Sequence, residues 1–199
     1  MATSFTLHSS AAEYLNWLGQ AISECKLPGT FRVRISVSCL AIAQDHHHAI
    51  VVLLDHKLYA SAFALVRCAL EAYVRGEWIA LCATDAEVKA FSEGTEPPPF
   101  GKLLEQLEQT PAFSEKVLSQ IKFHWWNAMC AYTHTGGLHV QRWGKGNSIE
   151  PNYSEGEVKE VLSFAEMIGS LAVVGVAYLA NNEQIAEGVL ARFKERFGG

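Results

Sequence analysis

The chain carries few charged side chains and no basic excess. Lys, Arg, Asp and Glu make up 19% of its 199 residues, and the formal net charge is −5. A net negative charge argues against a general affinity for the nucleic-acid backbone, so we expect no general affinity for DNA, and it leaves a local basic patch open. Apolar residues make up 49%, which argues against long disordered stretches and favours one domain over residues 1–199.

Paired cysteines and a signal peptide are also missing. The five cysteines are scattered, with no Cys-x-x-Cys pair: Cys25, Cys39, Cys68, Cys82 and Cys130. This pattern is typical of buried free thiols in a reducing compartment, not of a disulfide framework or a zinc site. The segment Met1–Phe5 shows no basic region leading into an apolar core, so we expect a cytoplasmic protein.

No apolar run is long and clean enough to predict a membrane span. The most apolar one, Leu162–Leu179, is interrupted by Glu166 and Gly169. A bilayer requires about 20 apolar residues, so a buried helix is the better interpretation and no membrane partner is expected.

Helix signals recur along the whole chain. Ser or Thr three residues before Glu, the capping-box spacing, occurs at Ser10, Thr84 and Ser154 and predicts helix starts there. Together with periodicity and turn residues, these signals predict a short helix from Thr84 and helices at about 10–25, 31–55, 57–83, 102–108, 110–134, 154–180 and 183–197. Glycines and Pro151 make residues 135–153 the longest irregular segment. The predicted fold is an all-α, single-domain bundle of about six to eight helices.

One segment has a pattern that conflicts with this fold. Residues 31–37 alternate between apolar and polar side chains, which by itself predicts a strand. We find no partner strand elsewhere, and an isolated strand leaves its backbone groups unpaired. We therefore predict that the second helix begins here.

A charged stripe lies in the otherwise apolar segment 59–81. Arg67, Glu71 and Arg75 are each four residues apart, so they share one side of a helix. They form either a solvent-facing ladder of ion pairs or a set of partly buried charges that binds an anion or orients a base.

A second polar feature closes the long helix near residue 134. His134 precedes the glycine pair at 136–137 and shares a helix face with Asn127; a hydrated surface stripe is the alternative interpretation. A histidine so placed can act as an acid–base group. Because unpaired buried polar groups cost about 1–3 kcal/mol each, we predict that His134 faces the Arg67 stripe across a helix–helix groove.

The histidine-rich segment 45–48 is a weak metal motif. Adjacent residues of a helix point in different directions, so three consecutive histidines cannot all reach one ion. Asp45 and His48 have the spacing of di-metal bundle sites, but those sites use the motif twice. We assign no metal ligands and no cofactor, and keep His48 and Asp55, which share an arc, as ligand-binding candidates.

Tryptophans cluster around the same long helix. Trp125, Trp126 and Trp143 could stack on bases, although adjacent tryptophans point to different faces, which favours core or dimer packing. We therefore expect a homodimer. The candidate site residues are, for catalysis, His134, Arg67, Glu71 and Arg75, and, for ligand binding, Tyr132, Thr135, Gly136, Asn127, His48 and Asp55.

Four segments together resemble a known group of proteins. The segments 47–50, 53–67, 71–76 and 132–136 resemble a family of uncharacterised bacterial helical proteins, itself similar to the HEPN (higher eukaryote and prokaryote nucleotide-binding) domains. The resemblance covers about residues 40–180. It implies a helical bundle, often a homodimer, with an RNA- or nucleotide-directed role of toxin or phage-defence type.

The resemblance leaves the chemistry open. HEPN nucleases carry an arginine, four to six residues and then a histidine on one late helix. If His134 is that histidine, Asn127, Ala128 or Met129 stands at the arginine position, so Arg67 or Arg75 would have to supply the charge. The alternatives are a non-catalytic dimeric binding or interaction module and a metal-dependent bundle enzyme that uses His48, Asp55 and His134.

Overall fold

The computed structural model describes residues 4–198, and the side chains of residues 10–198. The expectation about a signal peptide rests in part on the first three residues, which lie outside this range. Within residues 4–198 the structure contains nine α-helices, two short 3-10 helices and no strand. The α-helices are α1 Ser4–Ser23, α2 Phe31–Asp55, α3 Tyr59–Leu81, α4 Asp85–Ser92, α5 Phe100–Leu107, α6 Val117–Thr133, α7 Gly137–Val140, α8 Glu155–Leu179 and α9 Glu183–Phe197. The all-α prediction is confirmed, and the predicted number of helices was too small.

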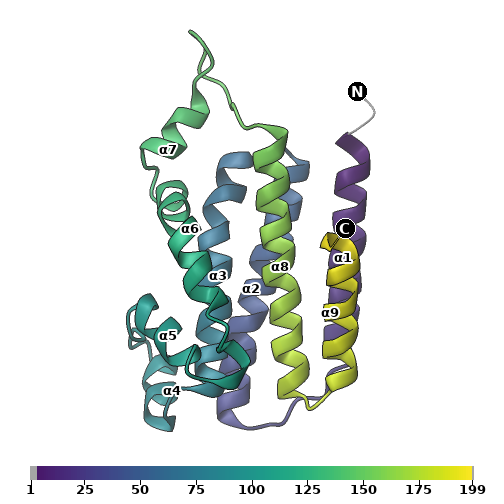
Figure 1. The fold of residues 1–199 in the computed structure, drawn as a ribbon, viewed down its shortest axis with the longest axis vertical. Coiled ribbons are helices and arrows are strands. Elements are labelled where there is room, and N and C mark those ends of the chain that lie inside the picture. Colours follow the sequence, from purple (N-terminus) through teal and green to yellow (C-terminus); the bar gives the residue numbers. More distant parts are fainter. Residues whose placement is uncertain (1–3, 199) are drawn as a thin grey trace.

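Three long helices, α2, α3 and α8, form the centre of the bundle (Figure 1). The side of α8 away from α3 is covered by α1 and α9, which contact each other through Arg196 and Ser10 and through Arg192 and Trp17. On the opposite side α6 packs along α3, and α4 and α5 lie beside the lower ends of α3 and α6 as drawn in Figure 1. This arrangement leaves α6 and α9 on either side of one face of α8.

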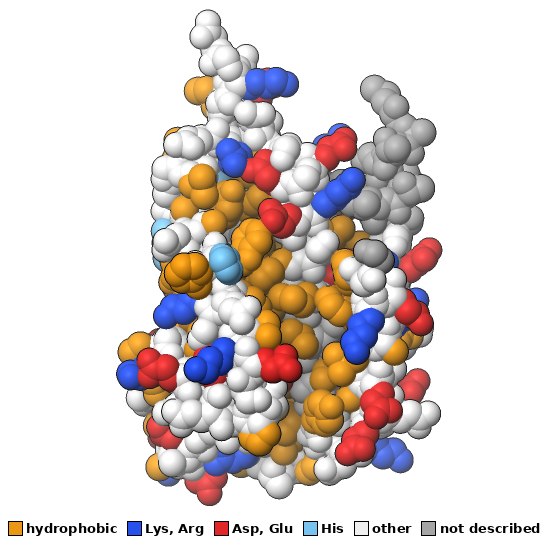
Figure 2. Space-filling model, viewed as in Figure 1, with side chains coloured by type: hydrophobic (Ala, Val, Ile, Leu, Met, Phe, Trp, Pro, Cys, Tyr) orange, Lys and Arg blue, Asp and Glu red, His pale blue; other side chains and the backbone are white. Residues whose placement is uncertain are grey.

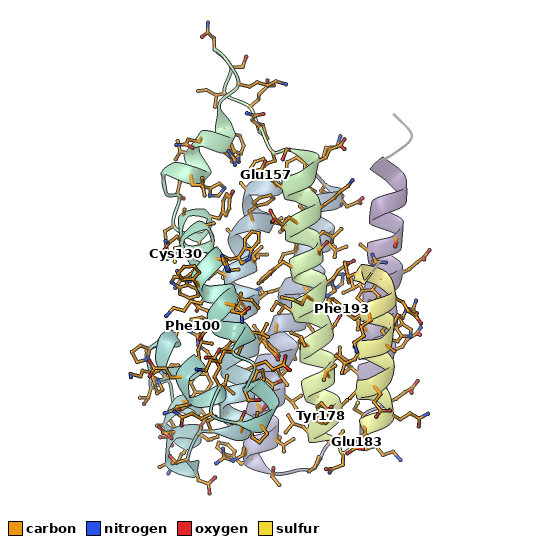
Figure 3. The ribbon with its side chains drawn as sticks, viewed as in Figure 1. Phe100, Cys130, Glu157, Tyr178, Glu183 and Phe193 are labelled. Carbon is orange, nitrogen blue, oxygen red and sulfur yellow. The ribbon has the colours of Figure 1, made fainter. Side chains whose placement is uncertain are left out.

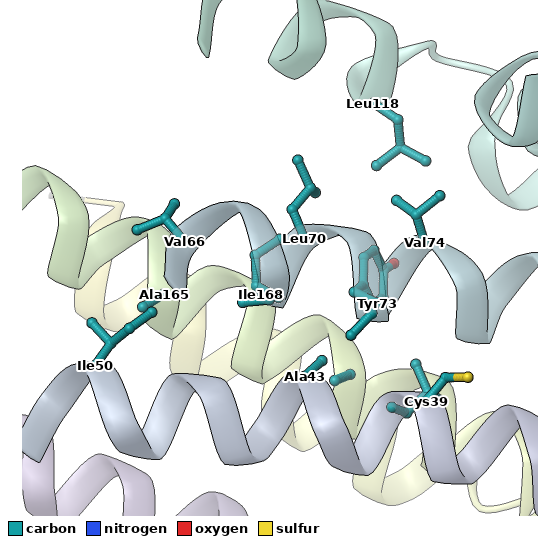
Figure 4. Packing of buried hydrophobic residues seen from close by; sticks show 14 of the residues in the cluster. Cys39, Ala43, Ile50, Val66, Leu70, Tyr73, Val74, Leu118, Ala165 and Ile168 are labelled. Carbon is teal, nitrogen blue, oxygen red and sulfur yellow. The ribbon is translucent and has the colours of Figure 1, made fainter. Parts of the chain in front are cut away.

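The core is formed where these three helices meet (Figure 4). Tyr73 of α3 is buried on the side of α3 that faces α2, whereas the buried Leu70 points toward the side of Leu118 at the start of α6 (Figure 4). The facing residues Ala43 and Ala165 are fully buried and small, so the helix axes can approach closely. Ser36 of α2 donates its hydroxyl hydrogen to the carbonyl of Gly76, 2.9 Å away, which satisfies a polar group inside the α2–α3 contact.

The alternating segment 31–37 is helical, as predicted. Thr30 caps α2, because its hydroxyl accepts a hydrogen bond from the amide of Val33 at 3.3 Å. Arg32 then donates to the carbonyl of Ile79 at 2.7 Å and pairs with Asp85 at 2.6 Å. The first turn of α2 thus binds the C-terminal end of α3, a contact that a strand pattern could not reveal.

Other predicted boundaries were wrong. Ser10 lies inside α1, which begins at Ser4, so its capping-box spacing does not mark a helix start. The helix predicted from 110 to 134 is broken, because 111–113 form a 3-10 turn and Lys116 has a left-handed φ of 56° just before α6. Residues 135–153 are less irregular than predicted, since they contain α7 and a 3-10 turn, Gln141–Trp143.

The cysteines and the apolar helices agree only in part with expectation. All five cysteines are free thiols, but Cys39 alone is buried and the other four are half-buried.

By length and composition α2 and α8 could each cross a membrane, and 67% of the apolar window of α8 is buried inside the bundle. The core helix of a soluble protein passes the same test.

Candidate functional site

The charged stripe of α3 is a partly buried ion-pair ladder. Nε of Arg67 lies 2.7 Å from one carboxylate oxygen of Glu71, and Nη2 of Arg75 lies 3.0 Å from the other. The three side chains are 21%, 16% and 33% exposed, respectively. The solvent-facing interpretation is therefore wrong. Two guanidinium groups and one carboxylate leave the ladder with a net positive charge.

His134, the residue that follows the last residue of α6, completes this group. Its Nε2 atom lies 2.7 Å from Nη1 of Arg67, so the predicted approach of His134 to the stripe is confirmed. A guanidinium has no acceptor, hence Arg67 donates and Nε2 accepts, which places the proton of a neutral ring on Nδ1. We call Arg67, Glu71, Arg75 and His134 the Arg67 cluster.

The turn after α6 fixes the position of His134. The hydroxyl of Thr133 donates to the carbonyls of Met129, at 2.9 Å, and Ala64 of α3, at 3.2 Å. Thr135 has a left-handed φ of 53°, and the amide of Gly136 donates back to Ala131 at 2.7 Å. A side chain at position 136 would place its Cβ 3.0 Å from the Cα of Ala131, so this tight return favours glycine.

The indole ring of Trp126 packs against the guanidinium of Arg67. The guanidinium carbon of Arg67 lies 4.7 Å from the indole centroid, and Phe100 stacks on the same indole at 4.4 Å and 12°. With both neighbours in place the indole has no free face for a nucleic-acid base. Arg67 is thus held by Glu71, His134 and Trp126 together.

The remaining predicted residues lie outside this cluster. Asn127 and Thr135 are exposed, as are His48 of α2 and Asp55 at its end. Tyr132 turns the other way, with its ring 5.1 Å from Phe63. Among the residues that the structure describes, no three His, Cys, Asp or Glu side chains are grouped so that they could hold a metal ion. The alternative of a metal enzyme built on His48, Asp55 and His134 therefore has no site.

The buried histidine of the 46–48 run is His47, which was not among the predicted site residues, and the candidate His48 is exposed. His47 is fully buried and neither ring nitrogen has a hydrogen-bond partner in the structure. Burial, with the positive charges of His48 and Arg196, lowers the pKa of His47 to about 4. A Cβ at Gly169 of α8 would overlap this imidazole, so the glycine makes room for it. No local signal in the sequence pointed to this pairing.

A second polar group was missed as well. Arg142, from the segment predicted to be irregular, forms an ion pair with Glu157 at the start of α8. Burial alone would raise the pKa of Glu157, but hydrogen bonds from Ser154 and Arg142 lower it below its usual value. Beside this pair the rings of Tyr132 and His139 lie 5.3 Å apart, and both nitrogens of the buried His139 lack a partner in the structure.

A hollow in the described surface lies next to this second group. A cavity of about 590 Å³ opens between α3, α6, α8 and α9, where apolar side chains gather in Figure 2. Its lining is predominantly apolar: Phe63, Val66, Ile121, Trp125, Ala128, Met129, Tyr132, Glu157, Glu160, Val161, Ser163, Phe164, Met167, Phe193 and Phe197.

Comparison with known proteins gives one finding. A family model described as "Family of unknown function (DUF6988)" matches residues 40–198. No curated protein and no solved structure matches the chain.

Proposed function

We propose that this chain, which belongs to DUF6988, a family of unknown function, is a cytoplasmic HEPN-like protein whose Arg67 cluster binds the phosphate of RNA or of a nucleotide. The observation that carries the proposal is the fixed position of Arg67. Glu71 and His134 each take one of its donor groups and Trp126 lies against its plane. Holding a guanidinium in place before binding reduces the entropy that a ligand must overcome.

The cluster has donors left for an anion. Nη2 of Arg67 makes no hydrogen bond within the described part of the chain, and Arg75 uses only one of its nitrogens. A guanidinium can offer two parallel N–H groups to a phosphate. Nδ1–H of His134 adds a third donor from another helix. With Glu71 neutralising one arginine, one positive charge remains for the phosphate.

The same arrangement is suited to phosphodiester chemistry. HEPN nucleases pair arginine and histidine on one helix, and here Arg67 comes from α3 and lies 2.7 Å from the histidine ring. Arg67 would stabilise negative charge on a phosphoryl group, and His134 would transfer a proton. Such an activity fits a toxin or phage-defence component.

The test compares wild type, Arg67→Ala, His134→Ala and His124→Ala with total RNA and with fluorescent nucleotides. His124 is the matched control, because it is an exposed histidine on the same helix whose ring contact is with Phe123. Wild type and His124→Ala should bind or cleave, and the two cluster variants should not. Absence of binding and cleavage by wild type, or an equal loss in His124→Ala, would refute the proposal. Circular dichroism checks that each variant is folded.

A second candidate is a non-catalytic dimeric interaction module. Large apolar side chains are exposed along α6 and the segment after it, among them Phe123 at 82% and Ile149 at 89%. Exposed apolar residues in such number favour a protein-binding surface, here one for a second copy. In this alternative the Arg67 cluster only holds α3 and α6 together. Substitutions in the cluster would then lower the stability of the protein, and neither wild type nor the variants would bind or cleave RNA or nucleotides.

A further inference from the structure

The cavity between α3, α6, α8 and α9 has the size and walls of a small-molecule site. Its volume of about 590 Å³ falls in the range of roughly 300–1,000 Å³ typical of ligand pockets. Figure 3 shows Glu157 at the N-terminal end of α8 and Phe193 further along the bundle on α9, and both line the cavity. Phe63 and Met129 form part of its inner wall and are buried.

The face of α8 that carries Phe164 and Met167 is left uncovered, because α6 packs on α3 rather than on α8. Leu118 and Met129 are the buried residues of α6, whereas α8 is buried along most of its length. Phe164 and Met167 of α8 therefore line an open hollow instead of a helix contact. An apolar hollow of this kind favours an apolar ligand, since water gains little from contact with its walls.

The charge at the cavity is negative. Glu157 and Glu160 are the only acidic residues that line it, and no Lys, Arg or His is among its lining residues. Arg142 and Ser154 engage the carboxylate of Glu157. Glu160 is exposed and, within residues 10–198, forms no ion pair or hydrogen bond. One uncompensated carboxylate thus stands at the edge of an apolar, aromatic cavity.

We propose that this cavity binds an amphipathic small molecule with an apolar body and one cationic group, such as an alkyl amine or a quaternary ammonium. The apolar body would lie against Phe63, Phe164 and Phe197, and the cation near Glu160. The aromatic walls add attraction for a cation. This site is separate from the Arg67 cluster, whose positive charge selects anions, and it does not depend on the proposed phosphate binding.

The test uses three probes with the same eight-carbon tail: octyltrimethylammonium, octanol and octanoate. Binding is measured by titration calorimetry and by the fluorescence of Trp125, which lines the cavity. The ammonium should bind most tightly and octanoate least. Glu160→Gln should weaken the ammonium by roughly fivefold, the size expected of an exposed ion pair, and leave octanol unchanged.

A cavity-filling variant locates the binding. Ala128 lines the cavity, so Ala128→Phe should abolish binding of all three probes, whereas Gln120→Phe, at an exposed position of the same helix, should not. Octanoate binding as tightly as the ammonium, or unchanged binding by Ala128→Phe, would overturn the proposal. It is also overturned if wild type binds no probe and forms a dimer that Ala128→Phe dissociates, because a second copy then fills the cavity.

Discussion

Glu77→Gln is expected to stabilise the protein above pH 7 and to have little effect near pH 4.5. Glu77 of α3 is 8% exposed and lies against Gly175 of α8, where any Cβ would overlap its carboxyl group. Burial raises the pKa of Glu77 from 4.5 to about 7. The side chain is therefore neutral in the folded protein under mildly acidic conditions, and a glutamine amide has the same shape and no charge.

The sign follows from proton binding. Because the folded-state pKa lies above the unfolded one, the folded protein binds more protons between pH 4.5 and 7, and its stability falls as the pH rises through this window. The difference between 4.5 and about 7, at about 1.4 kcal/mol per pH unit, corresponds to a loss of about 3 kcal/mol. Above pH 7 the glutamine variant should be more stable than wild type by up to this amount.

Urea denaturation of both proteins at pH 5 and pH 8 measures the effect. The difference in unfolding free energy between variant and wild type should be small at pH 5 and should approach the full value at pH 8. His47 also titrates on unfolding, but it is present in both proteins and cancels in the difference. An equal pH dependence of the two proteins would refute the reasoning, since Glu77 would then have the same pKa in the folded and unfolded states.

Three further predictions concern packing, acid sensitivity and assembly. Gly169→Ala should destabilise the protein by about 1–3 kcal/mol, because its Cβ would overlap His47, whereas Gly188→Ala, with nothing within 4 Å, should not lower the melting temperature. His47→Leu should make stability less sensitive to acid between pH 6.5 and 4, because burial lowers the pKa of His47 to about 4 and protonation then favours the unfolded chain; urea denaturation at pH 7 and pH 4 measures this. Light scattering at micromolar concentration should show a dimer that Phe123→Glu weakens, as Phe123 is 82% exposed, and a monomeric wild type would contradict the expectation.

Three of these predictions, for Glu77, Gly169 and His47, share a structural cause. Gly169 and Gly175 of α8 each accommodate a buried titratable side chain from a neighbouring helix, His47 of α2 and Glu77 of α3. Burial favours the neutral form of both side chains, because it lowers the pKa of His47 and raises that of Glu77. A neutral side chain costs less to bury than a charged one. The glycines of α8, which look like helix-weakening residues in the sequence, are thus required by the packing of side chains from other helices.

Sequence motifs predicted helix starts correctly where the contacts that stabilise the start lie within the same helix. The capping boxes at Thr84 and Ser154 are present, because each joins groups within one helical turn. The same spacing at Ser10 failed, since α1 continues through it and the hydroxyl instead accepts a hydrogen bond from Arg196 at 2.7 Å. The capping-box spacing therefore predicts a helix start only if the Ser or Thr hydroxyl is not hydrogen-bonded to a residue from elsewhere in the fold.

The spacing of Arg67, Glu71 and Arg75 determined their ion pairs, because side chains four apart on a helix are neighbours wherever the helix lies. The all-α fold also followed from the sequence alone. Only the tertiary structure decided which side of α3 faces α6, that His47 and not His48 is buried, and that α6 leaves a cavity on α8. Each of these depends on the packing of segments far apart in the chain, whose relative rotation and distance no local periodicity encodes.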